Sequence, residues 1–167
     1  MKKIIAMLFI SCELIFATDF GYVLDDINNT DIMLYKGSKI EVVDSSKVML
    51  KAFVNKENEL FYDKNLVFKI GKLNNDSLVS RTNEYTFKLK KDKFSKEPLN
   101  AWEEYEELYY EACTQCHSAH EPHEHTMLEW EGIYSSMAEQ SQLDEEVGTK
   151  VLKYLKSHAK DGFIVSE

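Results

Sequence analysis

The apolar residues of this chain change their spacing once, close to residue 97, and this change limits the folds open to the chain. Before that point they alternate with polar residues, as in 39–43, 47–54, 66–70 and 84–89, which is typical of strands with one buried face. After it they recur every three or four residues, as in amphipathic helices. The sequence therefore predicts an α+β chain in which strands precede helices.

Turn-forming residues separate the predicted strands. They occupy 36–38, 44–46, 55–58 and 73–76 and include glycine, serine, asparagine and aspartate, which adopt tight turns readily. About five strands of this length indicate a small antiparallel barrel or sandwich over residues 18–96. Because a module of roughly 70 residues buries little apolar surface alone, we expect it to pack against the helical part.

Three helices are predicted between residues 97 and 167. Each starts at a polar residue that an acidic residue follows three positions later, which is the spacing of a capping box. These pairs are Asn100 with Glu103, Thr126 with Glu129, and Ser141 with Asp144. The residues expected to face the core are Trp102, Tyr105 and Tyr109 in the first helix, Trp130, Ile133 and Tyr134 in the second, and Val151, Leu155 and Ala159 in the third. His158, near the end of the third helix, is placed to interact with its dipole.

The end of the first predicted helix holds the most specific motif of the chain, Cys-Thr-Gln-Cys-His at 113–117. Two cysteines at this spacing form thioethers with the vinyl groups of a haem, and the histidine that follows is then placed to bind the iron. The sequence therefore predicts one covalently attached haem c, with Cys113 and Cys116 as attachment points and His117 as proximal ligand. Residues 97–167 would then form a helical monohaem cytochrome c domain.

Other sites also use closely spaced cysteines. A redox-active dithiol would want a βαβ context, which this pattern lacks. A structural zinc site would lack its second pair of cysteines. A metal-binding module built from the two cysteines and the histidines of the following loop stays open as an alternative; these histidines are His120, His123 and His125.

The ligand on the opposite side of the iron would set the reduction potential, because a methionine raises it and a second histidine lowers it. Met137 lies 20 residues after the proximal histidine on an apolar helical stripe, although a methionine on such a stripe is also an ordinary core residue. His120, His123 and His125 follow the motif closely enough to reach the iron. The residues alone leave both ligand types open.

The first 17 residues have the pattern of a secretory signal peptide. Lys2 and Lys3 give a basic start, a short apolar segment follows, and Ala17 is the expected cleavage site. Cys12 leaves lipidation as an alternative. Covalent haem attachment in bacteria takes place outside the cytoplasm, so export and the cysteine motif agree. We therefore expect a periplasmic protein without stable membrane insertion.

Charge differs strongly between the two predicted parts. Residues 18–96 carry 14 Lys/Arg and 12 Asp/Glu, a net charge of +2, whereas residues 97–167 carry 4 and 16, a net charge of −12. An acidic surface repels nucleic acid and can steer the chain toward a basic patch on a protein partner. Charged outer faces also keep helices soluble. We therefore expect no nucleic-acid partner, and both explanations of the acidic surface stay open.

Both parts resemble the C-terminal region of the pentahaem cytochromes that serve periplasmic trimethylamine N-oxide reductase. In the first part the likeness is carried by residues 47–53, 60–62 and 69–73. In the second it is carried by residues 113–117, Pro122, Thr126, Trp130, Met137, residues 151–155 and residues 158–159. The resemblance implies a small β module, a final haem domain, and Met137 rather than a loop histidine as distal ligand.

The resemblance also implies a function. That family has a membrane-anchored portion that binds four further haems and takes electrons from quinol, whereas this chain has a single Cys-x-x-Cys-His motif. The chain would thus be a one-electron carrier and not an enzyme, supplied by a membrane quinol dehydrogenase and delivering to a molybdenum-containing N-oxide or S-oxide reductase. The alternative function is a haem-based sensor or ligand-binding protein with an open sixth coordination position.

Overall fold

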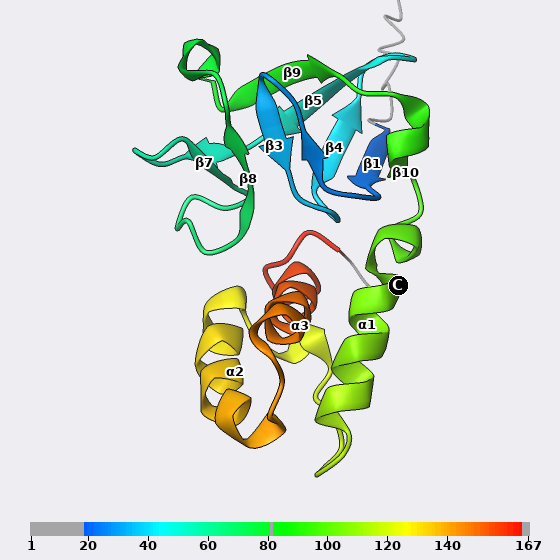
Figure 1. Cartoon of the computed structure of the whole chain (residues 1–167), viewed down its shortest axis with the longest axis vertical. Helices are drawn as coiled ribbons and strands as arrows, with labels where there is room; N and C mark the ends of the chain where they lie inside the picture. Colours follow the sequence, from blue (N-terminus) through cyan, green and yellow to red (C-terminus); the bar gives the residue numbers. More distant parts are fainter. Residues whose placement is uncertain (1–18, 81, 165–167) are drawn as a thin grey trace, which may run out of the picture.

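The computed structural model of the chain describes residues 19–80 and 82–164. The predicted signal peptide, with Cys12 and the cleavage site at Ala17, lies outside the described residues. Within them, strands come first and three α-helices follow (Figure 1), so the predicted α+β class with an antiparallel β part is confirmed. None of the helices in these ranges combines the length and hydrophobicity that a bilayer-spanning helix needs.

The described strands form two antiparallel sheets of five strands each. The first contains β1 (Phe20–Val23), β4 (Lys39–Val42), β5 (Lys47–Lys51), β9 (Glu84–Lys88) and β10 (Phe94–Ser95). The second contains β2 (Ile27–Asn28), β3 (Ile32–Leu34), β6 (Phe53–Val54), β7 (Glu59–Phe61) and β8 (Lys69–Leu73). Their orders are β10-β1-β4-β5-β9 and β2-β3-β8-β7-β6.

The number of strands corrects the prediction of about five. The predicted strand 47–54 is divided at Ala52, where the chain leaves β5 in the first sheet and enters β6 in the second. The predicted strand 66–70 begins only at Lys69, because Leu66 has a left-handed φ of 59° and lies in a turn. Strands β2, β6 and β10 have two residues each, which is too short for an alternating pattern to reveal.

The three predicted helices are present. They are α1 (Leu99–Cys113), α2 (Met127–Ser141) and α3 (Glu145–Ser157), and the single-turn 3-10 helices η1 (Asp76–Leu78), η2 (Lys91–Lys93) and η3 (Pro122–Glu124) lie in the connections. Helix α3 packs against both α1 and α2, and Figure 1 shows it between them. The predicted core positions Trp102, Tyr109, Val151 and Leu155 are buried.

Of the three predicted capping boxes, one forms at a helix start in the structure. Both hydrogen bonds of the Thr126–Glu129 box form at the start of α2. Asp144 caps α3, whereas Ser141 is the last residue of α2. Asn100 lies inside α1 and donates to Ser95 Oγ at 2.8 Å, so it does not cap the helix. Helix α1 instead begins directly after a proline, whose φ is already fixed at a helical value.

Trp102 joins α1 to the sheets. It is only 1% exposed, and its indole lies against the turn between β3 and β4, where a Cβ on Gly37 would come within 2.2 Å of Cζ2. Its ring centroid is 6.2 Å from that of Phe163, which also packs on Phe68 of the β part at 5.2 Å. The segment after α3 is thus held between helices and sheets, and a single hydrophobic core includes residues of both.

Lysines of α3 complete this contact between the two parts. Lys153 Nζ donates to the Lys36 carbonyl at 2.7 Å, and Lys156 Nζ donates to the Val67 carbonyl. Burial lowers the pKa of Lys153 to about 8. Lys153 and Lys156 are therefore directed to the sheets, in agreement with the expectation that the β part packs against the helices.

The contact between Gly37 and Trp102 gives a test of this arrangement. Gly37→Ala is expected to lower the free energy of unfolding by about 3 kcal/mol, because φ is +82° and the added Cβ meets the indole. Gly132→Ala in α2 is the matched control: nothing lies within 4 Å of the added Cβ, so a gain of about 0.5–1 kcal/mol is expected. Urea unfolding followed by circular dichroism measures both, and a wild-type midpoint for the Gly37 variant would contradict the contact.

Candidate functional site

The cysteine motif begins where α1 ends. Cys113 is the last residue of the helix, and Thr114 is its C-cap. Cys113 is half-buried and Cys116 is exposed, and both thiols are free. His117 follows in the turn and is also exposed. The end of α1 therefore carries the three residues that the sequence predicts to hold a haem, two of them exposed.

The environment of Cys113 disfavours a reactive thiolate. Burial raises the pKa of the Cys113 thiol, and a position at the C-terminal end of a helix faces the negative end of its dipole. Nucleophilic cysteines of redox-active dithiols have a lowered pKa, often because they lie at a helix N-terminus. Cys113 therefore has the opposite environment to that of a redox-active cysteine, because it lies at the C-terminal end of a helix and its thiol pKa is raised.

The His117 imidazole is oriented by the backbone of the residue that follows it. Its Nδ1 lies 2.7 Å from the Ser118 carbonyl oxygen. When Nδ1 carries the proton and donates it to this carbonyl, Nε2 keeps its lone pair available for a metal. A hydrogen bond of this kind commonly supports histidine ligands, because it fixes both the tautomer and the ring orientation.

Incompletely buried apolar side chains lie on the helices next to the motif. Tyr109 of α1 and Tyr134 of α2 both have raised pKa values, first through burial and then through the charge of Cys113. The partly buried apolar side chains of the helical part include Leu108, Ala119, Ile133, Tyr134, Leu143 and Val147. Such a surface fits a flat apolar cofactor that would complete its burial.

Met137 lies on α2, one helical turn beyond Tyr134. It is 40% exposed, so it is not the ordinary core residue that a methionine on an apolar stripe could be. Residues three apart on a helix share a face, and Met137 is therefore on the side of α2 that includes Tyr134. The structure holds Met137 on a different element from Cys113, Cys116 and His117, with its thioether accessible.

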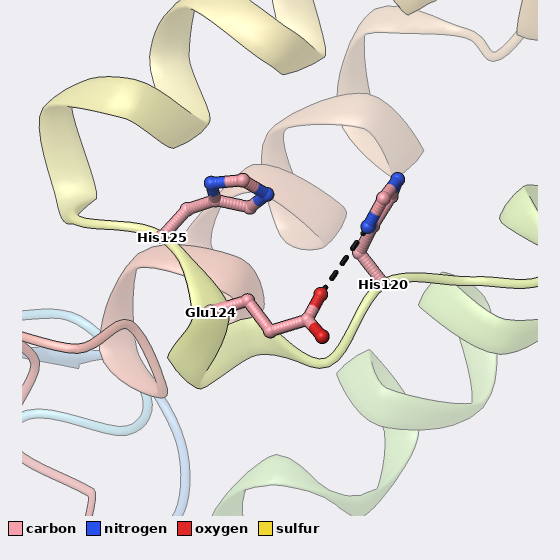
Figure 2. Close-up of side chains that lie close together, drawn as sticks. All are labelled: His120, Glu124 and His125. Atoms are coloured by element: carbon pink, nitrogen blue, oxygen red, sulfur yellow. Dashed lines mark hydrogen bonds and ion pairs between the residues drawn. The ribbon is translucent and has the colours of Figure 1, made fainter.

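The histidines of the following loop are held apart from the cysteines. His120 and His123 are exposed, and His125 packs edge-on against Trp130 with a ring distance of 4.9 Å. Within the described ranges, one group of three potential metal ligands is found, and it consists of His120, Glu124 and His125 (Figure 2). The cysteines are not in this group, so the alternative of a module built from the cysteines and the loop histidines together stays a prediction.

A cavity lies elsewhere, between α3 and the sheets. Its volume is about 1000 Å³, and its lining includes Tyr35, Lys69, Tyr105, Lys150 and Lys153. None of the predicted haem-binding residues lines it. The sequence analysis missed this cavity, although the repeat of lysines at 150, 153 and 156 signals one basic side of the third helix.

No family model, curated protein or solved structure matches the chain. The resemblance to the pentahaem cytochromes stays a prediction.

His158 differs from its prediction. It is the C-cap of α3, with ring centroids 5.7 Å from Trp102 and 4.3 Å from Tyr154. Burial lowers its pKa to about 4, so the ring is neutral near pH 7. A favourable interaction with the helix dipole would need a charged imidazolium, and His158 is instead part of the aromatic core.

The lowered pKa of His158 predicts a pH-dependent stability. Its ordinary value is 6.5 and its folded value about 4, so the unfolded chain binds more protons between these values and stability is lost as the pH falls through this window. From pH 7 to pH 5 the wild type should lose about 2 kcal/mol more than His158→Gln. Urea unfolding of both chains at the two pH values measures this difference, and equal losses would show that His158 is not protected from protonation.

Proposed function

We propose that this chain is a periplasmic monohaem c-type cytochrome that carries single electrons. The observation that supports the proposal best is the arrangement at the end of α1. Two free thiols at haem-attachment spacing adjoin an exposed imidazole whose Nδ1 faces a carbonyl. All three helices also carry partly exposed apolar side chains.

A bound haem would supply an iron that cycles between the ferrous and ferric states. The side chains of the protein would attach, orient and shield the cofactor. Cys113 and Cys116 would hold the cofactor by thioether bonds, and His117 Nε2 would bind the iron, with its orientation fixed by the Ser118 carbonyl. Apolar side chains such as Ile133 and Val147 would exclude water from the cofactor. The chain itself would perform no substrate chemistry.

Met137 is the proposed distal ligand. It is accessible and lies one turn from Tyr134, which is near Cys113. The nearest competitor in sequence is His120, only three residues after His117. If both rings bound the iron, one on each face of the haem, the backbone that joins them would have to run around the edge of the macrocycle. The macrocycle is too wide for a link of two residues to do so. Methionine ligation also agrees with the resemblance and would raise the potential.

The proposed partners follow from charge and resemblance. Residues 97–167 carry a net charge of −12, which favours docking on a basic patch of a protein. The resemblance implies a molybdenum-containing N-oxide or S-oxide reductase as electron acceptor and a membrane quinol dehydrogenase as donor. The predicted signal peptide supports a periplasmic location.

Haem attachment is tested on the exported chain. We expect the wild-type protein to retain haem through denaturing electrophoresis and to show a sharp α band when reduced. Cys113→Ser combined with Cys116→Ser should remove the haem, because no thiol remains to form a thioether. Gln115→Ala changes a motif residue that has no role in attachment, so this variant should keep the haem. A colourless wild-type protein would refute the proposal.

The distal ligand is tested on the haem-loaded protein. Met137→Ala should abolish the weak far-red charge-transfer band of ferric His/Met haem and allow the ferrous form to bind carbon monoxide. Met127→Leu, a change of a buried methionine to a side chain of similar volume, should preserve the band. If the wild type lacks the band, the methionine assignment is wrong, and rapid stoichiometric uptake of carbon monoxide by the wild type would favour the sensor alternative.

A further inference from the structure

The loop between α1 and α2 brings two imidazoles and a carboxylate together. We propose that His120, Glu124 and His125 form a binding site for one divalent transition-metal ion, with zinc as the reference ion. The potential ligand atoms of the three residues all lie within 4.8 Å of one another. Figure 2 shows the Glu124 carboxylate directed at His120, where His120 Nδ1 and Glu124 Oε2 are 3.2 Å apart.

Only a small movement separates this arrangement from metal coordination. A tetrahedral ion with bonds of about 2.0–2.1 Å places its ligand atoms roughly 3.4 Å apart. His120 and Glu124 already meet this spacing. His120 and Glu124 are exposed and His125 is only half-buried, so rotation of the side chains can close the remaining distance without displacing core residues.

The backbone that carries the three ligands is fixed from three sides. Tyr109 Oη of α1 donates to the His120 carbonyl at 2.6 Å, and Trp130 Nε1 of α2 donates to the Pro122 carbonyl at 2.7 Å. The Lys160 amide, which follows α3, donates to the His125 carbonyl at 2.8 Å. A metal site gains affinity when its ligands are held in place before binding, since less conformational freedom is lost.

The ring of His125 is oriented as well. It packs edge-on against the buried Trp130 with a centroid distance of 4.9 Å, and its centroid is 5.7 Å from that of His120. The same indole that fixes the loop backbone thus supports one of the ligands.

The donor set defines the class of ion. Two imidazole nitrogens and one carboxylate oxygen suit zinc, copper or nickel, whereas calcium and magnesium prefer oxygen ligands alone. Three protein ligands leave further coordination positions to water, as in sites with two histidines and one glutamate. The acidic character of residues 97–167, with a net charge of −12, also attracts a cation.

The site goes beyond the proposed haem function and does not depend on it. Its ligands exclude Cys113, Cys116 and His117, so haem and the second metal would not compete for a side chain. The His117 and His120 ring centroids are 6.1 Å apart, which would place the bound ion beside the motif.

Zinc titration of the exported full-length protein tests the site. The protein is purified without a polyhistidine tag and treated with a chelator, and binding is measured by isothermal titration calorimetry. We expect one ion per chain, with affinity lowered at least about tenfold by His120→Ala or His125→Ala and also lowered by Glu124→Gln. His123→Ala is the matched control, because His123 lies in the same loop but outside the group.

Two further outcomes keep the proposal falsifiable. Equal loss of affinity in the His123 variant would mean diffuse binding by a histidine-rich loop and would overturn the defined site, as would the absence of saturable binding. Because a variant can lose affinity by unfolding, Cu²⁺ bound to the wild-type protein is also examined by electron paramagnetic resonance. Two coordinated nitrogens support the site and sulfur coordination refutes it.

Discussion

The burial of Trp102 against Gly37 fixes the position of the helices relative to the sheets. The indole Nε1 has no hydrogen-bond acceptor in the described part of the chain, so shape and apolar burial hold the ring in place. The ring contacts the β3–β4 turn on one side and the segment after α3 on the other. Because Trp102 lies in the first turn of α1, this contact fixes the start of the helix, and the length of the helix then carries Cys113 away from the sheets.

The contact between helices and sheets also determines where the lysines and the carboxylates of the helical part lie. Lys153 and Lys156 donate to carbonyls of the β part, and Lys150 pairs with Glu104 of α1. Three of the four lysines in residues 97–167 are thereby used close to the sheets. The helical surface farther from the sheets is left with an excess of carboxylates, and the cysteine motif lies at that end. The β part therefore contributes to the electrostatic character of the motif surface without contributing a residue to it.

Local patterns predicted the features that depend on local chemistry. The change of period gave the α+β class, and the Thr126–Glu129 pair gave the start of α2, because a capping box involves only four consecutive residues. Features that depend on tertiary contacts were missed. The division of 47–54 requires knowledge of two sheets, and the neutral state of His158 requires its burial beside Trp102. Glu124 was not recognised as a neighbour of His120, although the two lie four residues apart in sequence, because η3 brings them together.

The anchored loop connects the question of the distal ligand with that of the second metal site. A shift of the loop backbone that brought His120 or His125 to an iron bound by His117 would break the hydrogen bond from Tyr109 to the His120 carbonyl or that from Lys160 to the His125 carbonyl. Tyr109 is 2% exposed, and leaving its buried hydroxyl unpaired costs about 1–3 kcal/mol. Met137 is under no such restraint, since its flexible thioether is accessible on α2. The hydrogen bonds that hold His120 and His125 in place for the proposed divalent ion thus disfavour these two histidines as ligands of the haem iron.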